Sequence, residues 1–201
     1  MIDKREIMNF SKELRLAPNV VEKDYVLGWL LAGIAHHSEL SASWIFKGGT
    51  CLKKCFFETY RFSEDLDFTT TDPDQLNEEF LTKAFTEIAD WVYEAAGVKI
   101  PKESLRFDVY QNPRGKTSVE GRIAFRGPMA MGGDLPRVRF DLTADEVLVL
   151  EPVMRKVHHP YSDNPADGIE VLCYCFEEVF AEKTRALKER LRGREKIPQS
   201  I

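Results

Sequence analysis

The stretch Phe46-Lys47-Gly48-Gly49-Thr50, followed by Ser63-Glu64-Asp65-Leu66-Asp67, carries the strongest structural and chemical signals in the sequence. Trp44-Ile45-Phe46 is a short apolar run before two glycines, which is typical of a buried strand that enters a turn. We expect Thr50 to be the N-cap of a helix after this turn. Glycines let a ligand approach the backbone, and a helix N-terminus offers N–H groups to phosphate. Because such turns are common, the glycine pair alone indicates phosphate binding only weakly.

Asp65 and Asp67 lie at the start of a strand that we predict over Leu66–Thr70. Residues i and i+2 of a strand face the same side, so the two carboxylates converge. Oxygen ligands of this kind suit Mg²⁺ (or Mn²⁺), which binds one or two carboxylates together with substrate phosphates. The alternative is a pair of surface acids at a strand end. Aspartate is disfavoured in strands, and a function explains that local cost.

A third carboxylate would complete a metal site, and two aspartates compete for this position. Asp141 alternates with apolar residues in Arg137–Thr143, and Asp108 has a similar setting in Leu105–Tyr110. Spacing alone does not choose between them. Arg61, four residues before Asp65, either holds a phosphate or forms a surface salt bridge.

The remaining pattern indicates an α+β fold with a mixed or antiparallel sheet and flanking helices. The first forty residues read as helical, and a long helix is expected from Asp72-Pro73 to Ala96, where Gly97 ends it. Further strands are expected over 118–125, 153–157 and 170–174, and a last helix over 177–191. We divide the chain into a core with leading helices, residues 1–175, and a C-terminal helix with a basic tail, residues 176–201.

Composition limits the class of protein. The chain has 201 residues and a net charge of −5, which argues against a broad nucleic-acid-binding surface. Between Lys183 and Lys196, however, seven basic and two acidic residues give a local charge of +5, which suits contact with phosphates or a solvated helix face. There is no apolar run of about 18 residues and no signal peptide, so we expect a cytoplasmic protein that does not enter a membrane.

The four cysteines form two pairs, Cys51 with Cys55 and Cys173 with Cys175. Neither pair has zinc-finger spacing, and cysteines of a cytoplasmic protein are most often buried thiols. We therefore expect buried thiols here and no metal site.

Taken together and in order, these segments resemble a known family. The glycine turn and the run Arg61-Phe62-Ser63-Glu64-Asp65-Leu66-Asp67-Phe68 are similar to the motifs of AbiEii-type nucleotidyltransferases. These proteins are the toxin components of abortive-infection toxin–antitoxin pairs in the DNA polymerase β-like superfamily. The resemblance covers roughly residues 20 to 192 and includes four further segments: Glu22-Lys23-Asp24-Tyr25-Val26-Leu27, Arg139-Phe140-Asp141-Leu142-Thr143, Val157-His158-His159-Pro160 and Glu178–Leu187.

The resemblance implies a role for each candidate site residue. Asp65, Asp67 and Asp141 would be the catalytic carboxylates and would hold Mg²⁺. Asp141 would also help to deprotonate the attacking hydroxyl. The nucleotide triphosphate would be bound by six residues: Gly48, Gly49, Thr50, Arg61, Ser63 and Lys183.

The resemblance also implies partners. The expected reaction transfers a nucleotide from an NTP to a hydroxyl group, with RNA, such as transfer RNA, as acceptor and a cognate antitoxin as regulator. Family members usually continue through an Arg-Asp-x-x-Asp-Leu segment into a C-terminal helical domain, whereas this sequence reads Arg192-Gly193-Arg194-Glu195 and ends at Ile201. We therefore expect a truncated helical domain. The alternative function is a catalytically impaired module that binds a nucleotide or a partner.

Overall fold

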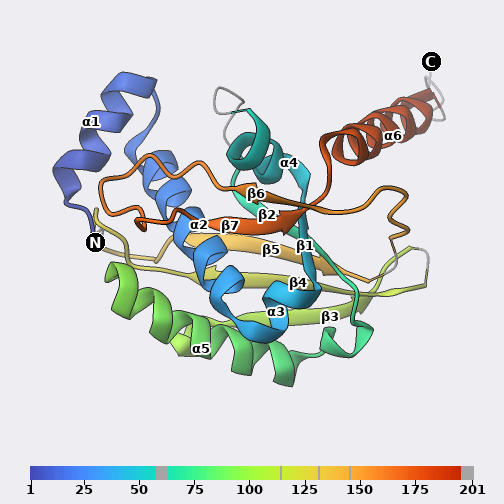
Figure 1. The fold of residues 1–201 in the computed structure, drawn as a ribbon, viewed down its shortest axis with the longest axis horizontal. Coiled ribbons are helices and arrows are strands. Elements are labelled where there is room, and N and C mark those ends of the chain that lie inside the picture. The colour runs from blue at the N-terminus through green and yellow to red at the C-terminus, as the bar shows by residue number, and fades with distance from the viewer. Residues whose placement is uncertain (58–62, 114, 131, 145, 196–201) are drawn as a thin grey trace, which may run out of the picture.

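A single mixed β-sheet organises the molecule (Figure 1). The computed structural model describes residues 1–57, 63–113, 115–130, 132–144 and 146–195. In these residues the sheet has seven strands in the order β3-β4-β5-β2-β1-β7-β6. Strand β1 pairs in parallel with β7, and β2 pairs in parallel with β5, while the other neighbours are antiparallel. The predicted α+β class with a mixed sheet is thus confirmed.

The strands agree closely with those predicted from the sequence. Every predicted strand begins and ends within one residue of its observed bounds. The observed strands are β1 (Trp44–Lys47), β2 (Asp65–Thr70), β3 (Arg106–Gln111), β4 (Thr117–Ala124), β5 (Arg137–Thr143), β6 (Val153–Lys156) and β7 (Glu170–Cys173).

Helices flank the sheet, and α5 and α6 lie on opposite sides of it (Figure 1). The helices are α1 (Lys4–Leu14), α2 (Pro18–His36), α3 (Ser38–Ser43), α4 (Gly48–Cys51), α5 (Glu78–Ala96) and α6 (Phe176–Glu195). A π-helical turn, η1 (Leu52–Phe56), continues α4, and two short 3₁₀ helices span Pro73–Gln75 and Lys102–Ser104. No helix among the described residues is long and apolar enough to cross a membrane.

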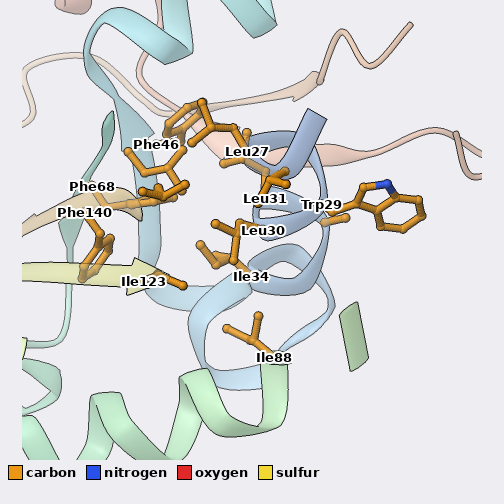
Figure 2. Packing of buried hydrophobic residues seen from close by; sticks show 14 of the residues in the cluster. Leu27, Trp29, Leu30, Leu31, Ile34, Phe46, Phe68, Ile88, Ile123 and Phe140 are labelled. Carbon is orange, nitrogen blue, oxygen red and sulfur yellow. The ribbon is translucent and has the colours of Figure 1, made fainter. Parts of the chain in front are cut away.

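The core lies between α2, α5 and the apolar face of the sheet. Phe46, Phe68 and Phe140 project from β1, β2 and β5, and Leu27 and Leu31 of α2 lie against them (Figure 2). All five side chains are buried. Burying each such side chain contributes about 1.5–3 kcal/mol, so this layer accounts for much of the stability of the sheet. The alternation that buries these residues places their neighbours, Lys47, Asp67 and Asp141, on the opposite face.

Two predictions about helix starts were wrong. Thr50 is not an N-cap: α4 begins two residues earlier, at Gly48, because the chain turns into the helix at the glycine pair itself. The long helix does not begin at Asp72-Pro73, where the chain makes only one 3₁₀ turn. Helix α5 begins at Glu78, since the side chain of Asn77 accepts a hydrogen bond from the Phe80 N–H and caps it.

Candidate active site

The register of the sheet lines up polar side chains from five strands on one face. Lys47 of β1 is paired with Asp67 of β2, and Asp67 with Asp141 of β5. Asp141 is paired with Glu120 of β4, and Glu120 with Asp108 of the edge strand β3. Paired residues on neighbouring strands have side chains on the same face within contact range. The row is therefore a lysine followed by four carboxylates.

This register separates the two candidates for the third carboxylate. Asp141 lies directly beside Asp67 on the adjoining parallel strand. Asp108 lies on β3, with β4 and β5 between it and β2, and its side chain is exposed. Asp65 begins β2 on the same face as Asp67. The structure thus brings Asp65, Asp67 and Asp141 together and leaves Asp108 at the edge of the sheet.

The glycine turn lies against these carboxylates. Gly48 has a φ of +77°, a left-handed backbone conformation, and a Cβ at this position would overlap the carboxylate of Asp67. A Cβ on Gly49 would lie 2.9 Å from the Ser63 hydroxyl oxygen and 3.7 Å from the Lys183 Nζ. The positive φ and the close approach of Asp67 therefore require glycine at position 48, whereas a side chain at position 49 would crowd Ser63. Ser63 and Lys183 meet at the same turn.

Thr50 is part of the turn but faces away from it. Its side chain is fully buried, and its hydroxyl donates a hydrogen bond of 2.5 Å to the backbone carbonyl of Asp65. The hydroxyl fastens α4 to the start of β2. Thr50 can therefore contact a ligand only through its backbone N–H. This group lies in the first turn of the helix, where N–H groups have no acceptor within the helix.

Burial and nearby negative charges raise the pKa values of Asp67 and Asp141. Burial, together with the charge of Asp141, raises the pKa of Asp67 to about 6. Burial and the charge of Glu120 also raise the pKa of Asp141. Among the described residues, no hydrogen bond or ion pair engages the carboxylate oxygens of Asp65, Asp67 or Asp141. This cluster of negative charge suits a divalent cation.

A second network holds α6 beside the turn. Lys47 forms ion pairs with Glu146, at 2.5 Å, and with Glu182 of α6, at 3.9 Å. Burial opposes ionisation of Glu146, but hydrogen bonding with Glu182 and the Lys47 charge lower its pKa to about 2. Burial and the same hydrogen bond raise the pKa of Glu182 to about 7. Because Glu182 is anchored in this way, the next residue, Lys183, is directed to Gly49.

Basic residues border the carboxylates on the other side. Asp65 is in register with Arg139 of β5, and Arg139 with Arg122 of β4. These three side chains line an open pocket of about 770 Å³, which Arg137 and Ser63 also line. Asp65 therefore lies in one pocket with three arginines, whose charge favours anions.

Most of the predicted site residues thus lie together. The structure also adds residues to the site that were not predicted from the sequence. Arg61 lies outside the described residues. Sequence reasoning did not identify Lys47, Glu120, Glu146 or Glu182. Two of them carried a signal: Lys47 adjoins the glycine pair, and Glu120 alternates with apolar residues in its strand. Glu146 and Glu182 lie in a loop and on a helix, and only the fold shows that they meet Lys47.

The comparisons with known proteins agree with this geometry. No match was found among curated proteins. A family model described as nucleotidyl transferase AbiEii toxin of a type IV toxin–antitoxin system matches residues 29–197, a span that contains the glycine turn and all three carboxylates. The chain therefore belongs to the AbiEii family of nucleotidyltransferase toxins.

Proposed function

We propose that this protein transfers a nucleoside monophosphate from an NTP to a hydroxyl group, with Mg²⁺ (or Mn²⁺) held by Asp65, Asp67 and Asp141. One observation carries the proposal: three carboxylates on adjacent strands converge beside a glycine turn, and none of them forms an ion pair with another described residue. Membership of a nucleotidyltransferase toxin family supports the same reaction.

The residues present fit a divalent cation. Burial and the charges of Asp141 and Asp65 raise the pKa of Asp67 despite the nearby Lys47 and Lys183, which supports a place for an added positive charge. When bound, Mg²⁺ supplies positive charge to the phosphates and to the attacking and leaving oxygens. In this arrangement Asp141 accepts the proton of the acceptor hydroxyl. Asp141 has this role because its carboxylate is less buried than that of Asp67.

The chain's own groups then bind the triphosphate. The backbone N–H groups of Gly48, Gly49 and Thr50 begin α4 and have no acceptor within the helix. The Ser63 hydroxyl and the Lys183 ammonium group meet at Gly49 and complete a cradle with positive charge. Arg61 belongs to this end of the site on the strength of the family resemblance. Positioning and charge of this kind account for most of phosphoryl-transfer catalysis.

The basic pocket indicates the class of acceptor. Arg122, Arg137 and Arg139 line it together with Asp65, so an anionic chain there would present a hydroxyl near the carboxylates. RNA, including transfer RNA, has the repeated phosphates and the terminal hydroxyl that this arrangement suits. We place the activity in the cytoplasm, under the control of a cognate antitoxin, as expected for a toxin of this family.

The proposal is tested by incubating the protein with bulk cellular RNA, Mg²⁺ and each α-labelled NTP in turn. We expect label to enter RNA with at least one NTP. Asp65→Asn and Asp67→Asn should abolish incorporation. Asp108→Asn is the matched control, because it removes an exposed carboxylate from the edge of the same row, and it should retain activity.

Other outcomes separate the alternatives. Transfer that persists in Asp67→Asn would refute the assignment of the site. Mg²⁺-dependent binding of an NTP without any transfer would favour a catalytically impaired binding module.

A further inference from the structure

Three of the four cysteines gather at one point, although the sequence separates them. Cys51 lies in α4, Cys55 in the π-helical turn and Cys173 at the end of β7. Their sulfur atoms all lie within 4.8 Å of one another. The pairing of β1 with β7 creates the cluster, because it places Cys173 beside Phe46 and so next to the helix that follows β1.

We propose that Cys51, Cys55 and Cys173 form a binding site for a single thiophilic d¹⁰ metal ion such as Zn²⁺ or Cu⁺. The sequence predicts buried thiols; Cys51 and Cys173 are buried, whereas Cys55 and Cys175 are only partly buried. The proposed site joins cysteines from two distant segments of the chain. This site is separate from the carboxylates and does not rest on the proposed nucleotidyl transfer.

The geometry fits thiolate ligation. A zinc–sulfur bond of about 2.3 Å requires sulfur atoms about 3.8–4.0 Å apart in a tetrahedral or trigonal site. The present separations of up to 4.8 Å need only small rotations of side chains. The sulfurs already converge, since all three lie within this distance of one another. On metal binding, each ligating thiol that carries a proton would lose it to solvent as its sulfur binds the metal.

The surroundings supply access and positive charge. Cys51 and Cys173 are buried, but Cys55 is partly exposed and lines a pocket of about 320 Å³ through which an ion can enter. Three thiolates around a divalent ion leave one net negative charge. Lys54 lies close enough to act on the charge of Cys55, and Arg155 on that of Cys173. Soft thiolate ligands select Zn²⁺ and Cu⁺ over Mg²⁺, so the two metal sites would not compete.

A bound ion would join elements around the glycine turn. Cys51 directly follows Thr50, whereas Cys173 belongs to the strand on the far side of β1. Bridging them would hold α4 and the π-helical turn against β7. We therefore expect loading to raise the stability of the fold around Gly48 and Gly49.

The test is a titration of the reduced, metal-free full chain with Co²⁺ and then Zn²⁺, followed by sulfur-to-cobalt charge-transfer absorption. We expect one Co²⁺ per chain with thiolate absorption, and displacement of Co²⁺ by Zn²⁺. Cys55→Ser and Cys173→Ser should each weaken binding at least about tenfold, since outer-shell changes alone cost that much. Cys175→Ser is the matched control, because Cys175 lies outside the cluster and its loss should leave binding unchanged.

Two further variants keep the test decisive. Cys55 is partly exposed, so circular dichroism should show that Cys55→Ser is folded even if Cys173→Ser is not. Asp67→Asn should retain thiolate absorption, which distinguishes failure of this site from failure of the proposed function. Absence of thiolate absorption in the wild type, or equal binding by folded Cys55→Ser, would overturn the inference.

Discussion

Two enclosed aspartates, Asp24 and Asp67, show opposite treatments of buried negative charge. Asp24 of α2 is only 3% exposed, and the Nζ atoms of Lys54 and Lys53 lie 3.1 and 3.7 Å from its carboxylate. The Tyr161 hydroxyl donates a further hydrogen bond of 3.1 Å. Burial opposes ionisation of Asp24, but the two lysines lower its pKa nevertheless. For Asp67, burial and the charge of Asp141 outweigh the charges of Lys47 and Lys183, and its pKa is raised to about 6.

The difference indicates a structural role for Asp24 and a chemical role for Asp67. The Asp24 charge is neutralised within the fold and connects α2 to the π-helical turn that follows the glycines. The Asp67 carboxylate lies against Gly48 and forms no ion pair among the described residues, although Lys47 and Lys183 act on its charge. A carboxylate that forms no ion pair among the described residues, such as that of Asp67, is available to a ligand. The comparison predicts that the two aspartates respond in opposite ways to substitution, pH and Mg²⁺.

The largest expected effect is on activity. Asp141→Asn should lower the rate of nucleotide transfer by about 10³-fold or more, because several kcal/mol of transition-state stabilisation depends on the metal ligands. Its fold should remain intact, since Asp141 is only partly buried and forms no ion pair among the described residues. Single-turnover transfer of labelled nucleotide, with circular dichroism as the control, measures this. A loss of less than tenfold would contradict the assignment.

A substitution at Asp24 should mainly reduce stability. Asp24→Asn should lower the free energy of unfolding by about 3–5 kcal/mol, because it leaves Lys54 buried without its counter-charge. Chemical denaturation measures the change. Asp108→Asn is again the control, and as an exposed substitution it should change stability by no more than about 0.5 kcal/mol. Equal stabilities of the two variants would show that the buried ion pair has no structural role.

In the metal-free protein, substitution of Asp67 should change the free energy of unfolding in the opposite direction to substitution of Asp24. Its pKa is raised from 3.8 to about 6, so the folded state binds a proton more tightly than the unfolded state. The contribution of Asp67 to the free energy of unfolding should therefore be most favourable below about pH 4 and should decline as the pH rises to about 6. Asp67→Asn should remove this decline and stabilise the metal-free chain by about 1–3 kcal/mol at pH 7.5. Urea denaturation in EDTA across this pH range tests the sign, and destabilisation by Asp67→Asn would contradict it.

The smallest expected effect concerns Glu120. Its charge helps to raise the pKa of Asp141, so Glu120→Gln should lower that pKa. The acidic limb of the pH–rate profile for transfer should then move to lower pH, with little change in the maximal rate. An unchanged acidic limb would show that Glu120 does not act on Asp141.

The strands could be predicted from the sequence more reliably than the first residues of the helices or the ion pairs around Lys47. A short apolar run before the glycines predicts β1, and alternation predicts strands such as β5, where buried and more exposed residues do alternate. Asp65 and Asp67 could be placed on one face by the same rule, whereas the choice of Asp141 over Asp108 needed the order of the strands. The Lys47 network and the cysteine cluster join residues from distant segments, so no local pattern predicts either.

The most direct test of the account is the effect of Mg²⁺ on stability at pH 7.5, measured by denaturation of the wild type, Asp67→Asn and Asp24→Asn. Mg²⁺ at about 100 times its dissociation constant should stabilise the wild type by about 2.7 kcal/mol. Asp24→Asn, although less stable, should gain a similar amount, because its carboxylate lies outside the metal site. Asp67→Asn should gain almost nothing. If Mg²⁺ stabilised Asp67→Asn as much as the wild type, the carboxylates of β2 and β5 would not be the metal site.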